Sequence, residues 1–119
     1  MKAQYRIKKS DEFLATMKRG KIYKNCAYII YLKPNTFSYI RIGISTSKKL
    51  GNAVTRNKIR RQIRSMIHDL INYECNKDIV IIVKKDYLNS DYKTNKTLLE
   101  EILNKEEGIL KWRKAQKLV

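Results

Sequence analysis

The chain has 119 residues, which is enough for one domain with a single modest core. Its 27 lysines and arginines face only 11 acidic residues, and the resulting net charge of +16 points to a polyanionic partner. No apolar run approaches the ~18 residues of a membrane span, and the N-terminus has no apolar export signal. We therefore expect a cytoplasmic protein with no membrane partner.

The first elements predicted are a basic segment and a short helix. Residues 1–9 are basic and expected to be extended. Ser10 is the expected N-cap of a helix over 11–18, because acidic residues follow it where the helix dipole favours them. Gly20 is expected to end this helix. Phe13 and Met17 lie four residues apart on one face, and periodicity alone places such a pair in the core.

The middle of the chain alternates between strands and one long helix. Residues 24–33 and 39–45 carry alternating apolar side chains and are expected to form two antiparallel strands around a turn at Pro34. A helix over 52–72 follows, with an apolar stripe that should cover the sheet. The continuous apolar run 78–83 predicts a buried central strand, reached by a strand–helix–strand crossover into parallel pairing.

The last third is simpler. Residues 86–92 are expected to form a loop and 93–104 a helix, while 110–118 is either a last short helix or a basic tail. The whole chain, 1–119, is thus predicted to be a single domain. Its predicted fold class is α/β (α+β), a two-layer sandwich on a mixed sheet of about four strands.

The stretch from Ser47 to Arg64, SKKLGNAVTRNKIRRQIR, carries the strongest functional signal. It holds seven basic residues and no acidic one, and such a density of like charge on one helix is repulsive unless an anion approaches. Arginines suit bidentate phosphate contacts. We therefore predict an RNA-binding surface made of this helix and its entry, with these residues: Lys48, Lys49, Asn52, Arg56, Asn57, Lys58, Arg60, Arg61 and Arg64.

Residues for protein-based catalysis are not grouped in the sequence. His68 is the only histidine and is expected on a helix surface rather than as a general base. Cys26 and Cys75 have no metal-ligand spacing and are expected to be reduced and mostly buried. We therefore predict no catalytic residue, no protein-bound metal and no cofactor held by the protein.

The segment KKLGNAVTRNKIRRQIR resembles the signature of the bacterial ribonuclease P protein subunit, and RIKKSDEF and RIGISTSKK extend the resemblance. The resemblance implies an αβββαβα order with a left-handed crossover around the motif helix. It also implies an endoribonuclease holoenzyme in which a catalytic RNA, using RNA-bound Mg²⁺, removes the 5′ leader of precursor tRNA. The protein would then be a monomeric partner of both RNAs.

The same resemblance implies a cleft for the precursor-tRNA leader. Its residues would be Phe13, Met17, Tyr31, Arg60 and Arg64. The two aromatic side chains could stack unpaired bases, so the resemblance moves Phe13 from the core to the cleft. Met17 departs from the family pattern, in which an aromatic residue is common at this place.

Two alternatives remain open at this stage. A non-catalytic RNA-binding module, such as a ribosomal protein or an RNA chaperone, would also carry a basic helix. A helix-turn-helix DNA-binding protein fits less well, because no second short helix precedes the basic one at the required spacing.

Overall fold

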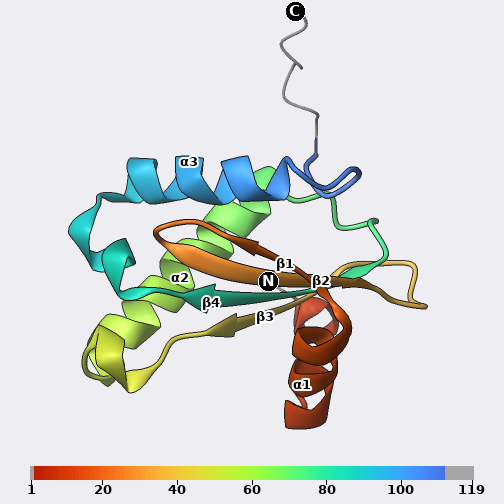
Figure 1. The fold of residues 1–119 in the computed structure, drawn as a ribbon, viewed down its shortest axis with the longest axis horizontal. Coiled ribbons are helices and arrows are strands. Elements are labelled where there is room, and N and C mark those ends of the chain that lie inside the picture. The colour runs from red at the N-terminus through yellow and green to blue at the C-terminus, as the bar shows by residue number, and fades with distance from the viewer. Residues whose placement is uncertain (1, 112–119) are drawn as a thin grey trace, which may run out of the picture.

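The computed structural model of the chain describes residues 2–111. One four-stranded sheet and three helices make up the fold (Figure 1). In chain order the helices and strands are α1 (Ser10–Arg19), β1 (Lys21–Lys24), β2 (Tyr28–Pro34), β3 (Arg41–Ser45), α2 (Ala53–Leu70), β4 (Lys77–Val83) and α3 (Tyr92–Leu103). This is the predicted αβββαβα order and the predicted mixed α+β fold.

The strand order in the sheet is β1-β2-β4-β3. β4 pairs antiparallel with β2 and parallel with β3, so the apolar run becomes a central strand as predicted. β2 and β3 run in opposite directions, as expected, but β4 lies between them. The parallel pair β3–β4 requires a crossover, and α2 provides it.

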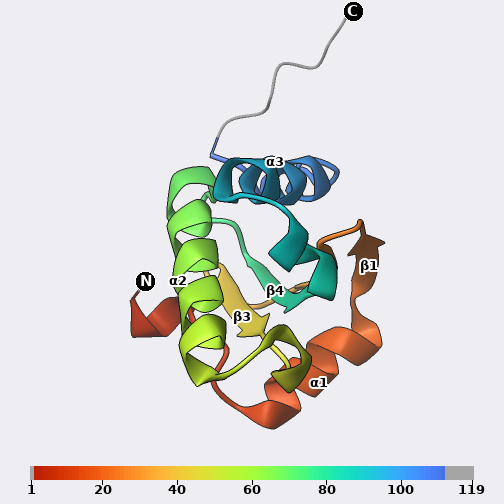
Figure 2. The same ribbon diagram turned by 90° about the vertical axis from the view of Figure 1, so that its left-hand side faces the viewer.

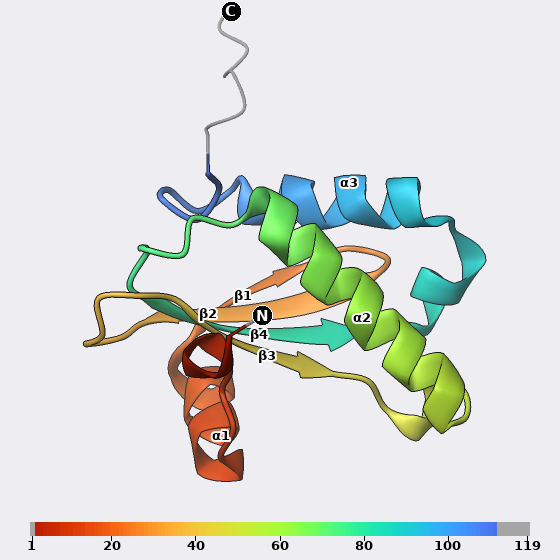
Figure 3. The same cartoon turned by 180° about the vertical axis from the view of Figure 1, so that it is seen from behind.

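The crossover is left-handed, as the resemblance implied. In Figure 3, α2 lies in front of the sheet, both strands run to the right, and β4 lies above β3. Nearly all strand–helix–strand connections have the opposite hand. Sequence patterns alone would therefore have given the wrong hand here.

The core lies between the sheet and the helices α2 and α3. The α2 stripe is fully buried, as predicted, and consists of Ile59, Ile63, Met66, Ile67 and Leu70. It packs on the sheet face that carries Ile30, Ile42 and Ile79. The buried hydroxyl of Tyr28 donates to the carbonyl of Asn95 at 2.8 Å, which ties α3 to the same face.

α1 packs on the opposite face of the sheet, below β2 and β4 (Figures 1 and 2). Register places Tyr31, Val80 and Gly43 in one row across this face. Val80 is fully buried, while Tyr31 is half-buried. The closeness of α1 to this row brings Phe13 onto the sheet.

Several expected boundaries differ from the structure. α1 begins at Ser10 itself, so Lys9 occupies the N-cap position and no side chain caps the helix. The region 24–33 is not one strand, because Asn25 reverses the chain between β1 and β2. Its Oδ1 atom accepts hydrogen bonds from the backbone N–H groups of Ala27 and Tyr28, each at 3.0 Å.

Three further expectations are met only in part. A 3-10 helix, Lys85–Asn89, occupies much of the loop expected over 86–92, and Leu110 pairs with Ile71 in an isolated bridge. The remainder of the predicted C-terminal element, 112–118, lies outside the described residues. Cys75 is buried as expected, but Cys26 is exposed because it sits in the β1–β2 turn. No helix in 2–111 is long and apolar enough to cross a membrane.

Candidate nucleic-acid interface

The entry to α2 is shaped by Gly51 and Asn52. Gly51 has φ of +132°, a conformation that L side chains rarely adopt. The side chain of Asn52 accepts a hydrogen bond from the backbone N–H of Thr55 at 2.9 Å and so caps the helix. The exposed Lys48 and Lys49 precede it in a 3-10 turn. Asn52, one of the predicted RNA-binding residues, therefore uses its Oδ1 atom to cap α2.

The basic residues of α2 project along two edges of the helix. Arg56, Arg60 and Arg64 recur at four-residue steps along one edge, and Arg64 lines a cleft together with Arg6 of the N-terminal segment. Lys58 and Arg61 lie on the other edge, in a shallow hollow of about 320 Å³ that Tyr92 of α3 also lines. The predicted surface is therefore continuous around α2 but faces two directions.

The positive charge of this surface is not neutralised by ion pairs within residues 2–111. Among residues 2–111, no acidic side chain forms an ion pair with any basic residue between Lys48 and Arg64. Asp69, the one acidic residue of α2, is engaged by Lys96 of α3 at 2.7 Å. Burial lowers the pKa of Arg64, and the neighbouring positive charges of Arg6 and Arg60 lower it further. An approaching anion would relieve this repulsion.

A cleft of about 230 Å³ opens between α1, β3 and α2. Its lining includes Phe13 and Arg64, two of the residues that the resemblance assigned to a leader cleft. Phe13 lies directly over Gly43, since a Cβ atom at Gly43 would stand only 2.4 Å from Cζ of the ring. The tip of the half-buried Phe13 ring therefore meets the sheet, and the same side chain lines the cleft.

The other three residues assigned to the leader cleft lie around this opening rather than in its lining. Arg60 is one turn of α2 before Arg64, and it donates to the hydroxyl of Thr46 at 2.5 Å and to the amide oxygen of Asn57. Tyr31 lies on the same sheet face as Gly43, with Val80 between them. Met17 is half-buried one turn after Phe13 on α1.

Sequence reasoning missed Arg6, which lines the cleft opposite α2. The N-terminal segment reaches this position because Arg6 bridges to Ile42 and the N–H of Ile7 donates to the carbonyl of Ile42 at 3.0 Å. The segment is therefore fixed against the edge strand β3. The basic stretch RIKK was the only sequence signal that could have suggested this contact.

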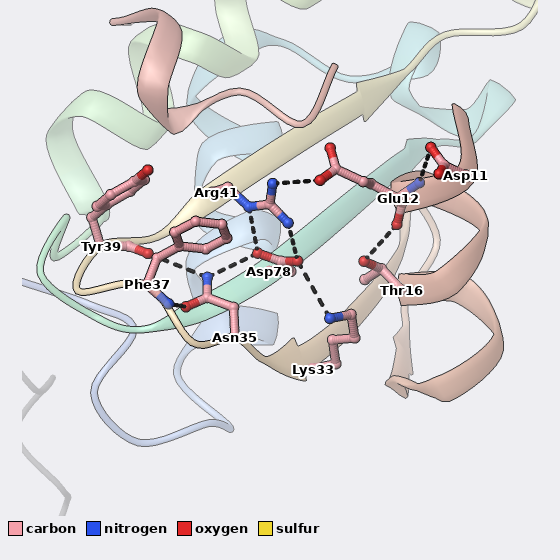
Figure 4. A network of polar contacts seen from close by, with 9 residues as sticks. All are labelled: Asp11, Glu12, Thr16, Lys33, Asn35, Phe37, Tyr39, Arg41 and Asp78. Carbon is pink, nitrogen blue, oxygen red and sulfur yellow. Dashed lines mark hydrogen bonds and ion pairs between the residues drawn. The ribbon is translucent and has the colours of Figure 1, made fainter. Parts of the chain in front are cut away.

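A buried ion network holds α1 in place beneath the sheet (Figure 4). The Arg41 guanidinium binds both carboxylate oxygens of Asp78, at 3.0 and 2.8 Å, and reaches Glu12 of α1 at 2.9 Å. Asn35 donates to Asp78 at 2.8 Å, and the Lys33 ammonium lies 3.5 Å away. Burial alone would raise the pKa of Asp78, but these hydrogen bonds outweigh it and the pKa lies below its usual range. Because Glu12 directly precedes Phe13, the network also positions the cleft.

The structure offers few groups for acid–base chemistry near this surface. His68 is exposed, as predicted. No three histidine, cysteine or acidic side chains gather around a common point in the part of the chain described here. What the arrangement can do directly is bind a polyanion through α2 and hold an unpaired base beside Phe13.

Comparison with known proteins points to one family. A sequence model of the family described as Ribonuclease P matches residues 1–107. The ribonuclease P protein component of Listeria innocua is 44% identical over 107 residues, which cover 87% of this chain and 88% of that protein. The corresponding protein of Mesoplasma florum is 43% identical over 105 residues, covering 87% and 96%.

Solved structures agree with the sequence comparison. The RNase P protein of Staphylococcus aureus superposes with a TM-score of 0.78 at 34% identity, over 87% of this chain and 96% of that one. The RNase P protein of Thermotoga maritima superposes with a TM-score of 0.76 at 29% identity, over 87% and 98%.

Proposed function

Because the chain belongs to the ribonuclease P protein family, we propose that it binds the catalytic RNA and the 5′ leader of precursor tRNA and so assists removal of the leader. The observation that carries the proposal is the shared position of Arg64. This residue belongs to the unneutralised basic surface of α2 and also lines the cleft with Phe13. A single-stranded RNA whose phosphate contacts Arg64 can therefore place its next base beside the ring of Phe13.

The two edges of α2 support a division of labour. The edge with Arg60 and Arg64 faces the cleft and suits an unpaired leader, because aromatic stacking with nearby arginines binds single strands with little regard to sequence. The edge with Lys58 and Arg61 faces away from the cleft. We assign that edge, with Lys48 and Lys49, to the backbone of the catalytic RNA, where phosphate contacts dominate affinity.

In this proposal the RNA carries out the hydrolysis and holds the Mg²⁺ ions that it requires. The acidic side chains of the protein support this assignment, since several are engaged elsewhere. Asp78 is bound by Arg41, Asp69 by Lys96, and Glu106 by the hydroxyl of Tyr23 at 2.5 Å. The protein's contribution is to position the leader and to lessen repulsion between two polyanions. We propose that it does so in the cytoplasm and as a monomer.

The test is reconstitution with the catalytic RNA of the same organism, at low Mg²⁺, on a precursor tRNA with a leader of several nucleotides. Wild-type protein should restore cleavage, and Arg61→Ala should weaken this rescue. Lys105→Ala removes an equally exposed charge beyond the end of α3 and should leave rescue unchanged. Binding to the RNAs without any rescue would instead favour an RNA-binding module that takes no part in cleavage.

A further inference from the structure

A second pocket opens beside α2 at the far side of the N-terminal segment. It has a volume of about 340 Å³ and is lined by Lys2, Tyr5, His68 and Tyr73. His68 follows Arg64 by four residues, which is about 6 Å along a helix axis. The pocket and the cleft are therefore neighbours on one edge of α2, and the N-terminal segment contributes to both.

The walls of this pocket are aromatic. The rings of Tyr5 and Tyr73 have their centroids 4.5 Å apart with an angle of 45° between their planes. Tyr39 meets Tyr5 edge-on from outside the pocket, at 5.8 Å and 82°. Lys2 and His68 are exposed at the rim. Aromatic rings flanked by nitrogen donors form the usual surface for an unpaired base and its phosphate.

Backbone hydrogen bonds hold these rings in position. The N–H of Ile40 donates to the carbonyl of Tyr73 at 2.9 Å, and the N–H of Tyr5 donates to the carbonyl of Lys2 at 3.1 Å. The bridge between Arg6 and Ile42 anchors the same segment to β3. Because these bonds restrain the backbone on both sides of the pocket, little conformational entropy would be lost there on binding.

We propose that this pocket is a second base-stacking site for single-stranded RNA. An unpaired nucleobase packs on the Tyr5–Tyr73 ring pair, and His68 and Lys2 contact the adjoining phosphates. The occupant is an RNA strand rather than an apolar peptide because Arg60, Arg64 and His68 continue one acid-free edge of α2 directly to the pocket. The inference rests on the proposed function, since the same strand first crosses the cleft at Arg64.

Packing alone is the competing explanation, because Tyr5 and Tyr73 also contact the hydrophobic core. Tyr39 provides a matched control. It belongs to the same aromatic cluster and packs on Tyr5, but it does not line the pocket. Because Tyr73 packs on the core and Tyr39 does not, the melting temperature of each variant is measured alongside binding. A purely structural role of Tyr73 predicts a lower melting temperature and a similar loss at every RNA position, whereas a binding role predicts loss at one position in a folded chain.

The experiment uses the full chain and an unstructured RNA of about eight nucleotides, with 2-aminopurine placed at each position in turn. Stacking on a ring quenches this fluorescent base. With the wild-type protein, 2-aminopurine fluorescence should be quenched at two neighbouring RNA positions. Phe13→Leu should abolish the quench at the position assigned to the cleft and preserve the quench at the other. Tyr73→Leu should abolish the quench at this second position and lower affinity for the RNA roughly five- to a hundredfold. Tyr39→Leu should retain the quench at both positions.

His68→Ala serves as a second variant whose folding is not at issue, because the side chain is exposed. Loss of one hydrogen bond should lower affinity roughly fivefold, and Lys105→Ala should not. Unchanged quenching and affinity in both Tyr73→Leu and His68→Ala would overturn the inference, and so would equal losses in Tyr39→Leu and Tyr73→Leu. If Phe13→Leu still abolished its own quench, the leader cleft would stand. A wild-type chain that binds no single-stranded RNA would overturn both proposals.

Discussion

Arg41 and Arg64 show two opposite uses of the same side chain. Arg41 lies between Asp78 and Glu12, and its hydrogen bond to Asp78 raises its pKa even though burial acts against it. Arg64 is also partly buried, yet burial and the charges of Arg6 and Arg60 all lower its pKa. Both remain protonated at neutral pH, as arginines do. The first charge is satisfied by the protein itself, and the second is left for a ligand.

The two regions are joined through α1. Glu12 contacts Arg41, and the next residue, Phe13, lines the cleft with Arg64. The ring of Phe37 lies over the Arg41 guanidinium, with its centroid 4.5 Å from Cζ, and adds a cation–π contact to the network. The internal ion network is thus a support for the binding surface, and the two can be separated by mutation.

The largest effect should follow from breaking the internal network. Asp78→Ala leaves Arg41 buried without its main partner, and the loss of one member of a buried ion pair costs about 3–5 kcal/mol of unfolding free energy. Urea unfolding would measure this. Asp69→Ala is the matched control, because it breaks the exposed pair with Lys96 and should cost about 1 kcal/mol or less. Equal small losses in both variants would contradict the structural role of Asp78.

Acid should act on the same carboxylate. The folded-state pKa of Asp78 lies below the ordinary value of 3.8, so its contribution to stability is present above that pH and is lost as the pH falls through the lower folded pKa. Wild type should therefore lose stability more steeply than Asp78→Ala in this range. Unfolding curves recorded between neutral and strongly acidic pH would compare the two slopes, and parallel slopes would contradict the assignment.

A similar cost is expected on the apolar face of α2. Ile63 is completely buried, so Ile63→Ala should lower the free energy of unfolding by about 2–5 kcal/mol. Lys58 lies on the exposed side of the same helix, so Lys58→Ala should leave stability almost unchanged while it weakens RNA binding. Thermal unfolding of both variants checks this contrast. A wild-type melting temperature for Ile63→Ala would mean that the packing face is wrongly assigned.

Much of the fold was predictable because local periodicity determines it. The apolar stripe of α2 predicts a helix and the face that it buries, and the continuous apolar run of β4 predicts a buried strand. The separation of β1 from β2 was missed because Asn25 makes the turn with its side chain, without the glycine or proline that marks most turns. The crossover hand is a long-range property that no local pattern encodes, and only the family resemblance supplied it.

A moderate effect on binding is expected at Tyr31. If this side chain joins Phe13 in holding the leader, Tyr31→Ala should lower affinity for precursor tRNA roughly five- to a hundredfold and leave mature tRNA nearly unaffected. Parallel titrations with the two RNAs measure the ratio. Equal losses for both RNAs, together with a lower melting temperature, would indicate that Tyr31 only packs against the sheet.

The candidate site was predictable in part. The basic residues of α2 are close in sequence, so helical spacing alone gathers them on one surface. The cleft draws on α1, β3, α2 and the N-terminal segment, and its assembly depends on contacts between distant residues. Arg6 and the Tyr5–Tyr73 pair were therefore missed, as was the Asp78 network, whose members come from α1, three regions of the sheet and a turn.

The most direct test compares Arg64→Ala with Arg41→Ala, measuring precursor-tRNA affinity against salt concentration and unfolding in parallel. In Arg64→Ala, the logarithm of precursor-tRNA affinity should fall less steeply with the logarithm of salt concentration, by the slope of about one phosphate contact. The free energy of unfolding should be unchanged or slightly higher, because a repulsive charge is removed. Arg41→Ala should lower that free energy and, under conditions where the variant is folded, keep the wild-type salt slope. A wild-type salt slope in Arg64→Ala, with stability reduced as much as in Arg41→Ala, would contradict the account.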